Sequence, residues 1–325
     1  MSLNYVKDYN REIREWLLKV FALAASIPKN CLVRRTCPVC KTAESTFFAN
    51  NDHLDYVRCS RCDLIYMNPA LSADMVDKGF QGEDELLMEY FSLISSYKTG
   101  RSEKPDPVTD CKLKDIYAIK SSGRLLDIGC SFGDFLRKAA YFYEVEGVEV
   151  NPETAEIASR EFVVYRKSLQ ELKLSQNYDI VTLHQVLYGL SDPVRLFVEI
   201  HKILKRDGLL YVNTPNAESY AMRLYRGKAN HLYGYTTQNV FSYKSLQALA
   251  EKTGFRISTF RTEWLDIYLS DLMFFLDERK DFIHKRNTQI PGYEEHMKQE
   301  DELQRSLGLD LGERGNYLVA VLEKT

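Results

Sequence analysis

A chain of 325 residues is long enough for one large α/β domain with a small appendage, and its 45% hydrophobic and 27% charged residues are ordinary for a globular protein. The formal net charge of −3 gives no global basic field, which disfavours nucleic acid as a partner. No apolar run reaches the length of a transmembrane helix, so the sequence predicts a cytoplasmic protein without a membrane-spanning segment. The composition indicates no particular oligomeric state.

Residues 1–35 are predicted to form an N-terminal helix. Six apolar side chains fall on one helical face: Ile13, Trp16, Leu17, Val20, Phe21 and Ala24. A secretory signal peptide is disfavoured, because Lys19 interrupts the apolar run and acidic residues precede it. We therefore expect a packing helix, with a membrane-surface or dimer helix as the alternative.

Residues 36–70 are predicted to form a small zinc ribbon. Four of the seven cysteines follow a C-x2-C-x18-C-x2-C pattern: Cys37, Cys40, Cys59 and Cys62. Two such knuckles supply four thiolates to a tetrahedral Zn²⁺, and a site closed by four protein ligands is structural rather than catalytic. Two disulfides or a redox pair are the alternative, but no feature indicates an oxidising compartment. Of the other three cysteines, Cys31 and Cys111 are interpreted as ordinary residues, and Cys130 lies in a glycine turn where a small residue suffices.

Residues 71–118 are predicted to be a mixed helical segment that links the ribbon to the following domain. The stretch 99–110 is rich in charge, proline and serine, which is typical of an irregular connection. This stretch is a candidate hinge, or a lid over the pocket that the next domain is expected to form.

Strand and helix patterns alternate through residues 119–325, which predicts a doubly wound α/β fold with a parallel sheet and helices on both faces. Strands are expected at 124–128, 145–150, 163–166, 178–183, 209–214, 255–261 and 317–323. Helices are expected at 132–143, from 152 onward, at 193–204 and at 244–252, with prolines at two of the starts. Residues 264–312 are expected to be mostly helical.

The most informative motif lies at the end of the first expected strand. Asp127 lies in an apolar run that leads into the glycine turn 129–133, with the sequence GCSFG. The second strand then ends near a single carboxylate, Glu149. This layout builds a pocket for an adenosine, whose ribose hydroxyls need a hydrogen-bond acceptor. A nicotinamide dehydrogenase is the rival on fold grounds, but its G-x-G-x-x-G spacing is lacking.

The order of these motifs resembles a class I S-adenosylmethionine-dependent methyltransferase over about residues 120–325. The resemblance is carried by Asp127-x-Gly129-x-x-x-Gly133, Glu149, Tyr178-Asp179-Ile180-Val181, Asp192-Pro193 and Gly208-Leu209-Leu210. A zinc ribbon joined to such a domain is similar to a bacterial group that methylates sugars or other cell-surface and secondary-metabolite intermediates. The resemblance implies a Rossmann-like sheet and S-adenosylmethionine as cofactor. It also implies a small or carrier-linked acceptor, for which methylation of an oxygen atom is favoured over methylation of carbon or nitrogen.

The resemblance also implies contacts between particular residues and the cofactor. Those lining the methionine and ribose side are Asp127, Gly129, Cys130 and Gly133. Glu149 would accept hydrogen bonds from the ribose hydroxyls. Ser168 and Leu169 would contact the adenine edge, and His184 and Gln185 would flank the methionine and the sulfonium.

Two departures from the family pattern keep other interpretations open. The middle glycine of the turn is Ser131, and the Glu-His that often precedes Asp-Pro is replaced by Tyr188 and Gly189. A regulatory or scaffold protein that binds the cofactor with little catalysis is therefore an alternative. An RNA methyltransferase is another, opposed by the overall acidity and supported by basic residues near the knuckles: Arg34, Arg35, Lys41, Arg58 and Arg61.

Two histidines are candidate general bases for the acceptor. His184 follows the strand 178–183 beside the expected pocket, and His231 lies in the insertion after strand 209–214, where this fold usually builds its acceptor site. Histidine titrates near neutral pH and suits this role, although a lone histidine is more often structural. Polar and aromatic side chains around the same insertion suit a sugar: Tyr211, Asn213, Asn216, Tyr220, Tyr225, Tyr233 and Tyr235.

Overall fold

The fold is seen in a computed structural model of the chain. The described residues are 26–51, 54–86, 107–175, 177–219, 236–263 and 315–325, together with 15, 16, 19, 22, 23, 88, 89, 91, 92, 222, 223, 226–229, 231 and 232. The helical segment expected over 264–312 and most of the N-terminal helix lie outside the described residues, as do Tyr220, Tyr225, Tyr233 and Tyr235.

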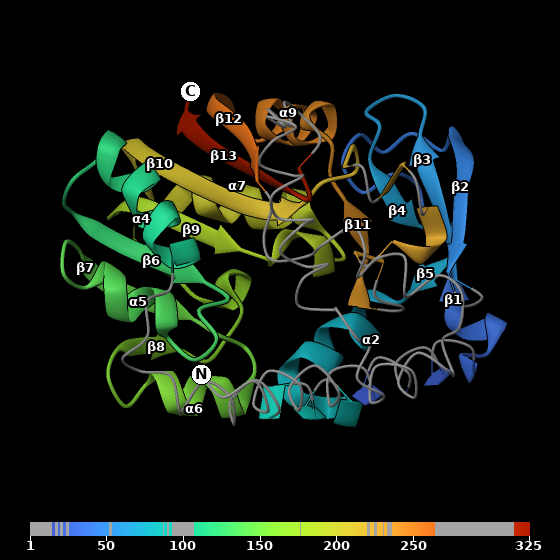
Figure 1. Cartoon of the computed structure of the whole chain (residues 1–325), viewed down its shortest axis with the longest axis horizontal. Helices are drawn as coiled ribbons and strands as arrows, with labels where there is room; N and C mark the ends of the chain where they lie inside the picture. Colours follow the sequence, from blue (N-terminus) through green and yellow to red (C-terminus); the bar gives the residue numbers. More distant parts are fainter. Residues whose placement is uncertain are drawn as a thin grey trace, which may run out of the picture.

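A seven-stranded sheet carries the second half of the chain, in the order β12-β13-β10-β9-β6-β7-β8 (Figure 1). Its strands are β6 Arg124–Ile128, β7 Glu144–Val148, β8 Val163–Tyr165, β9 Tyr178–His184, β10 Leu204–Pro215, β12 Phe255–Glu263 and β13 Tyr317–Lys324. The five strands from β8 to β10 are parallel, whereas β13 is antiparallel to β10 and β12. The predicted doubly wound α/β sheet is confirmed, with an antiparallel edge.

Helices cover both faces of this sheet. The α-helices are α2 Ala73–Lys78, α4 Pro107–Ile119, α5 Asp134–Ala139, α6 Pro152–Ala158, α7 Pro193–Ile203 and α9 Tyr243–Lys252. Short 3-10 turns are η1 Lys29–Cys31, η3 Leu169–Glu171, η4 Leu187–Gly189 and η5 Arg226–Lys228, and η2 Gly79–Glu83 is a π-helical turn. In Figure 1, α4 and α5 lie in front of the sheet and α7 lies behind it.

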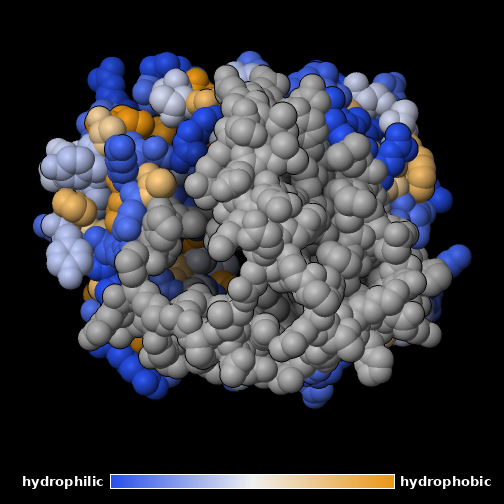
Figure 2. Space-filling model, viewed as in Figure 1, coloured by the Kyte–Doolittle hydropathy of each residue, from blue (hydrophilic) through white to orange (hydrophobic). Residues whose placement is uncertain are grey.

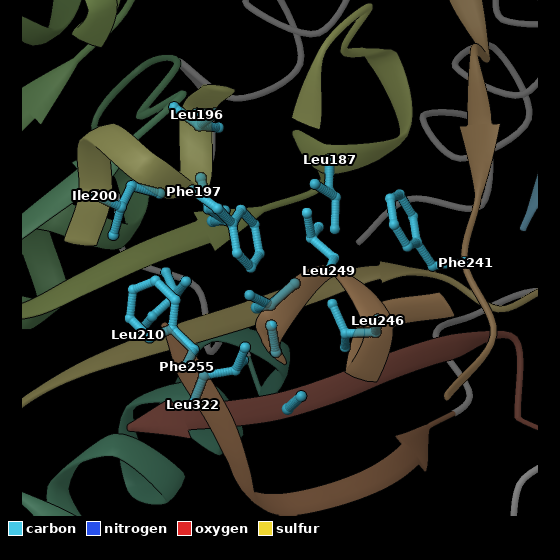
Figure 3. Packing of buried hydrophobic residues seen from close by; sticks show 14 of the residues in the cluster. Leu187, Leu196, Phe197, Ile200, Leu210, Phe241, Leu246, Leu249, Phe255 and Leu322 are labelled. Carbon is cyan, nitrogen blue, oxygen red and sulfur yellow. The ribbon is translucent and has the colours of Figure 1, made fainter. Parts of the chain in front are cut away.

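Side-chain alternation along β10 divides the core between the two faces. Tyr211 belongs to a buried cluster with Leu136 of α5. Leu210 belongs to the opposite cluster, where Phe197 of α7 and Leu249 of α9 pack together (Figure 3). Successive side chains of a strand point to opposite faces, so an apolar strand that is covered on both sides forms two cores.

Two helices begin at caps that are visible in the sequence. The side chain of Asn151 accepts a hydrogen bond from the N–H of Thr154 at 3.2 Å, and Pro152 follows at the first helical position of α6. The side chain of Asp192 accepts from the N–H of Arg195 at 3.2 Å at the start of α7. These side chains satisfy backbone donors that have no partner inside the helix.

The boundaries of two helices differ from the predicted ones. α4 already begins at Pro107, inside the stretch 99–110 that was expected to be irregular, because proline is tolerated in the first turn of a helix. The helix expected over 132–143 is limited to Asp134–Ala139, and the left-handed Gly133 precedes it. Helix ends are set by such local backbone geometry more than by apolar periodicity.

The cysteine-rich unit lies early in the sequence, but its sheet includes a strand from the second half of the chain. Its sheet has the order β11-β4-β3-β2, formed by β2 Ser45–Asn51, β3 Leu54–Cys59, β4 Ile65–Met67 and β11 Asn239–Val240. Beside it, β1 Leu32–Val33 pairs with β5 Ala70–Leu71. One strand of the ribbon sheet therefore comes from the segment between β10 and α9.

Polar contacts hold the ribbon against that segment and against α9. Arg35 donates to the carbonyl oxygens of Gln238 at 2.9 Å and Met67 at 3.0 Å, and burial lowers the pKa of its guanidinium to about 10. The ammonium of Lys252 in α9 donates to the carbonyl oxygen of Val39 in the first cysteine knuckle at 2.7 Å. The ribbon thus contacts the α/β part of the chain in two places, at the first cysteine knuckle and beside the strands β4 and β11.

None of the described helices has the length and apolar character needed to cross a lipid bilayer. On the face shown in Figure 2, the described surface is mainly hydrophilic, with apolar side chains scattered among polar ones.

Candidate functional site

The glycine turn after β6 has the backbone geometry that its residues predict. Gly129 and Gly133 both have left-handed φ values, 76° and 79°. The N–H groups of Gly129 and Cys130 donate to the carbonyl oxygen of Val148 at 2.7 Å and 3.2 Å, which ties the turn to the end of β7. A Cβ atom at Gly129 would collide with the Val186 side chain. Only glycine therefore fits the first position of this turn.

Glu149 is buried against the same turn. One carboxylate oxygen accepts from the N–H of Ser131 at 2.8 Å, and the other accepts from the N–H of Asn151 at 2.8 Å. Burial raises the pKa of Glu149, and these backbone donors oppose the rise. Ser131 takes the place of the usual middle glycine with a φ of 49°, so the turn keeps its left-handed course and aims an N–H group at the carboxylate.

Asp127 is almost fully buried at the end of β6. Its Oδ1 accepts from the hydroxyl of Thr182 on β9 at 2.7 Å. Burial raises the pKa of Asp127 to about 7, against the lowering effects of the Thr182 hydrogen bond and the positive charge of Lys112. This carboxyl group therefore titrates near neutral pH in the protein without ligand.

The raised pKa of Asp127 predicts a pH-dependent cost to stability. A carboxyl with a raised folded-state pKa stabilises the fold below its unfolded pKa of about 3.9, and that stability is lost as the pH rises toward 7. We expect Asp127→Asn to gain about 2–3 kcal/mol of unfolding free energy relative to wild type when the pH rises from 5 to 8. Urea unfolding at both pH values measures this, and a gain independent of pH would contradict it.

His184 and Gln185 lie where β9 ends, next to the glycine turn on β6. The His184 ring lies between Phe135 of α5 and Tyr211 of β10, with ring centroids 4.3 Å and 5.4 Å away. Both of its ring nitrogens are buried and have no hydrogen-bond partner among the described residues. Burial lowers the pKa of His184, and the charge of Lys112 lowers it further, so the ring is neutral.

A polar network that the sequence did not reveal extends from Gln185 across three strands to α4. Gln185, at a left-handed φ of 57°, donates from its amide to Asn213 Oδ1. Asn213 Nδ2 donates to Glu263 Oε1 at 2.8 Å, and Arg261 donates to Glu263 Oε2 at 2.8 Å and to Asp115 Oδ2 at 2.5 Å. The pKa of Arg261 is raised by these partners despite its partial burial.

Ser168 and Leu169 follow β8, the strand beside β7. Ser168 and Glu171 form a capping box, in which the Ser168 N–H donates to Glu171 at 3.0 Å, and Leu169 is buried in the core. The N–H of Glu149 donates to the carbonyl oxygen of Tyr165 at 3.0 Å, so the β8 end is tied to the predicted ribose carboxylate. Ser168 and Leu169 thus follow the strand that pairs with β7, and Glu149 follows β7 itself.

His231 is buried on the far side of β10 from His184. Its ring packs edge-on against Tyr317 of β13 at 4.9 Å, and its Nε2 has no partner among the described residues. Burial lowers the pKa of His231 to about 4. The sheet order places β10 between β9, which carries His184, and β13, which begins at Tyr317. His184 at the end of β9 and His231, which packs against the start of β13, are therefore separated by β10 and do not lie side by side.

The four predicted metal ligands are brought together in the ribbon. The sulfur atoms of Cys37, Cys40, Cys59 and Cys62 all lie within 4.8 Å of one another. The closest approaches are 3.4 Å and 3.6 Å, far longer than the bond of about 2.05 Å in a disulfide. A tetrahedral zinc with Zn–S bonds of about 2.3 Å requires sulfurs about 3.8 Å apart, so the donor set fits this ion.

Comparison with known proteins points to one family. Residues 108–259 match the sequence profile of a family described as a methyltransferase domain. An uncharacterised methyltransferase of Schizosaccharomyces pombe is 31% identical over 160 residues, covering 44% of this chain and 56% of the relative. An uncharacterised protein of Methanocaldococcus jannaschii is 25% identical over 136 residues, covering 41% of this chain and 65% of the relative. The chain thus spans less than two thirds of each of these relatives.

Solved structures of methyltransferases are also among the similar proteins. A Thermotoga maritima S-adenosylmethionine-dependent methyltransferase, described as a possible histamine N-methyltransferase, has a TM-score of 0.46 and 21% identity, covering 67% of this chain and 89% of the other. A putative methyltransferase of Bacillus halodurans has a TM-score of 0.47 and 15% identity, covering 65% and 96%. The glycine turn, Glu149 and the five parallel strands β6 to β10 all lie within residues 108–259, the part of the chain that matches the methyltransferase-domain profile.

Proposed function

We propose that this protein transfers a methyl group from S-adenosylmethionine to a small or carrier-linked acceptor, with oxygen favoured over carbon or nitrogen. The observation that carries the proposal is the buried Glu149 carboxylate, which lies 2.8 Å from an N–H of a left-handed glycine turn. A carboxylate in that place can accept hydrogen bonds from ribose hydroxyls, and the glycines of the turn, which lack side chains, let a ligand approach the backbone closely.

The cofactor supplies an electrophilic methyl group and a neutral thioether leaving group. The protein has to align the acceptor with the S–CH₃ bond, and good alignment removes about 7–11 kcal/mol of the barrier. Asp127 and the turn would hold the methionine side, and Gln185, fixed by Asn213, would border the reacting end. A sugar or another polar ring with a free hydroxyl suits this edge of the sheet, where amide, imidazole and phenol groups gather.

His184 is our candidate for the residue that removes a proton from the acceptor. Its ring is held between two aromatic side chains and is neutral, so one of its two buried ring nitrogens has a free lone pair for a proton from an acceptor bound against it. We expect His184→Ala to lower the rate of methyl transfer by about 10²- to 10⁴-fold, while the affinity for S-adenosylhomocysteine changes little. His231→Ala is the comparison, and the larger loss of rate identifies the base. Equal, small losses for both variants would exclude both histidines.

Cys37, Cys40, Cys59 and Cys62 would hold one zinc ion as the four ligands of a structural site. Its closed set of sulfurs leaves no position for substrate, so the ion supplies stability rather than chemistry. The RNA-methyltransferase alternative loses support, because two of its five basic residues are already engaged. Arg35 binds backbone carbonyls and Arg58 pairs with Glu218 at 2.6 Å.

Calorimetry with S-adenosylhomocysteine tests the cofactor assignment, and product analysis across a panel of hydroxyl, amine and carbon acceptors tests the reaction. We expect micromolar or tighter binding and methylation of at least one hydroxyl acceptor. Tight binding without turnover on any acceptor would favour the cofactor-binding scaffold. Binding of a reduced dinucleotide, with no heat from the methyl donor or its product, would overturn the proposal.

A further inference from the structure

Gly189 leaves room for an aromatic ring from a distant part of the chain. A Cβ atom at this position would lie 2.9 Å from Cζ and 3.2 Å from Cε2 of Phe80, which is closer than carbon atoms pack. Gly189 has no positive φ value, so its backbone conformation does not require glycine. The space left by the missing side chain at the end of η4 is therefore filled by the ring of Phe80, which belongs to the π-helical turn η2.

The same turn also contacts the start of α6. Gly82 in η2 has a left-handed φ of 99°, and a Cβ atom there would lie 3.1 Å from both Cδ and Cγ of Pro152. A few residues further along the chain, the sulfur of Met88 accepts a hydrogen bond from Nδ2 of Asn151 at 3.1 Å. Asn151 and Pro152 lie two and three residues after Glu149. η2 thus touches η4 with one residue and the start of α6 with another.

These two contacts place η2 across the end of β6. β6 lies between β9 and β7, and the three strands are parallel, so their carboxyl ends meet at one edge of the sheet. Since η4 follows β9 and α6 follows β7, a turn that touches both crosses the end of β6, where the glycine turn 129–133 lies. In Figure 1 the chain that follows α2 runs toward α6. η2 therefore lies over the candidate cofactor site.

The segment from α2 to η2 is held more firmly at its base than at its end. Val76 of α2 is buried in one cluster with Leu54 of the ribbon sheet, whereas the ring of Phe80 is only half-buried at the border of that cluster. Gly79 and Gly82 stand on either side of Phe80 in η2, and glycine tolerates the backbone changes that a hinge requires. η2 can therefore turn about its glycines while α2 stays in place.

The carboxylates expected to face the cofactor are covered in this arrangement, with Glu149 only 8% and Asp127 only 2% exposed. We propose that Phe80 and Gly189 form a latch, and that the cofactor enters and leaves its pocket only when the latch opens and η2 turns away from η4. The inference depends on the proposed function, because the ligand that passes the latch is the nucleoside cofactor, and it adds a control of cofactor exchange to that function.

A latch has a kinetic signature that a wall of the pocket does not have. If Phe80 and Gly189 make the same contact with and without the ligand, the latch limits entry and exit alike and does not favour either state. Loss of the latch should therefore raise the association rate and the dissociation rate by the same factor and leave the dissociation constant unchanged.

Surface plasmon resonance with the whole, zinc-loaded chain immobilised measures both rates for S-adenosylhomocysteine. We expect Phe80→Ala to raise each rate about 5- to 50-fold, the range for loss of a partly buried phenylalanine contact, with the dissociation constant within about threefold of wild type. Gly189→Ala, whose added carbon meets the ring, should have the same effect, and the double variant should add little because both changes act on one contact. Phe48→Ala is the matched control, because Phe48 of β2 packs against the same cluster as Phe80, and it should change neither rate by more than about twofold.

Unchanged rates in Phe80→Ala would overturn the inference. Faster dissociation with an unchanged association rate would overturn it too, because that result assigns Phe80 to the wall of the pocket. Thermal unfolding of each variant without ligand reports on folding, and Phe80→Leu replaces the alanine variant if the fold is perturbed. If the wild-type protein binds no S-adenosylhomocysteine, the proposed function falls and this inference falls with it. If the wild type binds it and the variants exchange it at wild-type rates, the function stands and the latch does not.

Discussion

Replacing Glu149 with alanine is expected to raise the dissociation constant of S-adenosylhomocysteine by at least about 100-fold. Two hydrogen bonds from ribose hydroxyls to a carboxylate account for this, since a bond to a charged group contributes about 1.5–3 kcal/mol. The same substitution leaves the N–H groups of Ser131 and Asn151 without the oxygens that they now contact, which loosens the glycine turn. Isothermal calorimetry measures the constant directly.

Glu153→Ala is the matched control for this experiment. Glu153 is an exposed acidic residue in the first turn of α6, a few residues beyond Glu149. Its removal changes the net charge by the same amount and should alter the affinity by less than about threefold. Glu149→Gln separates charge from shape, and we expect most of the loss to appear there too. Full affinity in Glu149→Ala would show that the ribose is held elsewhere.

Removal of the metal is expected to have the largest effect on stability. Structural zinc contributes about 10–16 kcal/mol of apparent binding free energy in small zinc-binding peptides, and that energy is coupled to folding. Here Cys37, Cys59 and Cys62 belong to the same buried cluster as Leu246 and Phe241, so loss of the ion would open the core beside α9. We expect chelation or Cys59→Ser to lower the melting temperature by at least about 10 °C.

The same change should weaken cofactor binding from a distance. The N–H of Gln238, beside β11, donates to the carbonyl oxygen of Tyr188 in η4 at 2.9 Å, and η4 follows directly on Gln185 and Val186. Calorimetry, metal content per chain and scanning calorimetry on one preparation test both effects. Cys111→Ser is the control, because that cysteine is exposed on α4. An unchanged melting temperature after complete removal of the ion would refute a structural role.

The strands of the α/β sheet were predictable because each is a short apolar run that ends at a turn residue. β6 coincides with the predicted 124–128, and β9 and β13 extend only one residue beyond their predictions. The cysteine pairs were predictable for a similar reason: the chemistry of a knuckle requires two ligands at short spacing. The glycine turn and Glu149 likewise depend on local backbone geometry, and the structure places them in contact.

The features that were not predictable depend on contacts between distant segments. Arg261, Glu263 and Asp115 form one network, although nothing in the apolar pattern links α4 to the last residues of β12. β11 is only two residues long, and no periodicity marks it as a strand of the ribbon. The burial of His231 against Tyr317 also depends on how β13 returns to the sheet. Such contacts are set by tertiary packing, which single-residue patterns do not encode.

The pairing of β11 with β4 has a consequence for biosynthesis. The cysteine knuckles leave the ribosome early, but the strand that borders their sheet is made only when residues 239 and 240 have been synthesised. A fragment that ends before this point would leave β4 with an open edge, a template for wrong pairing with other chains. The four-stranded ribbon sheet can therefore be completed only after residues 239 and 240 have been made, so its folding is tied to the synthesis of the later half of the chain.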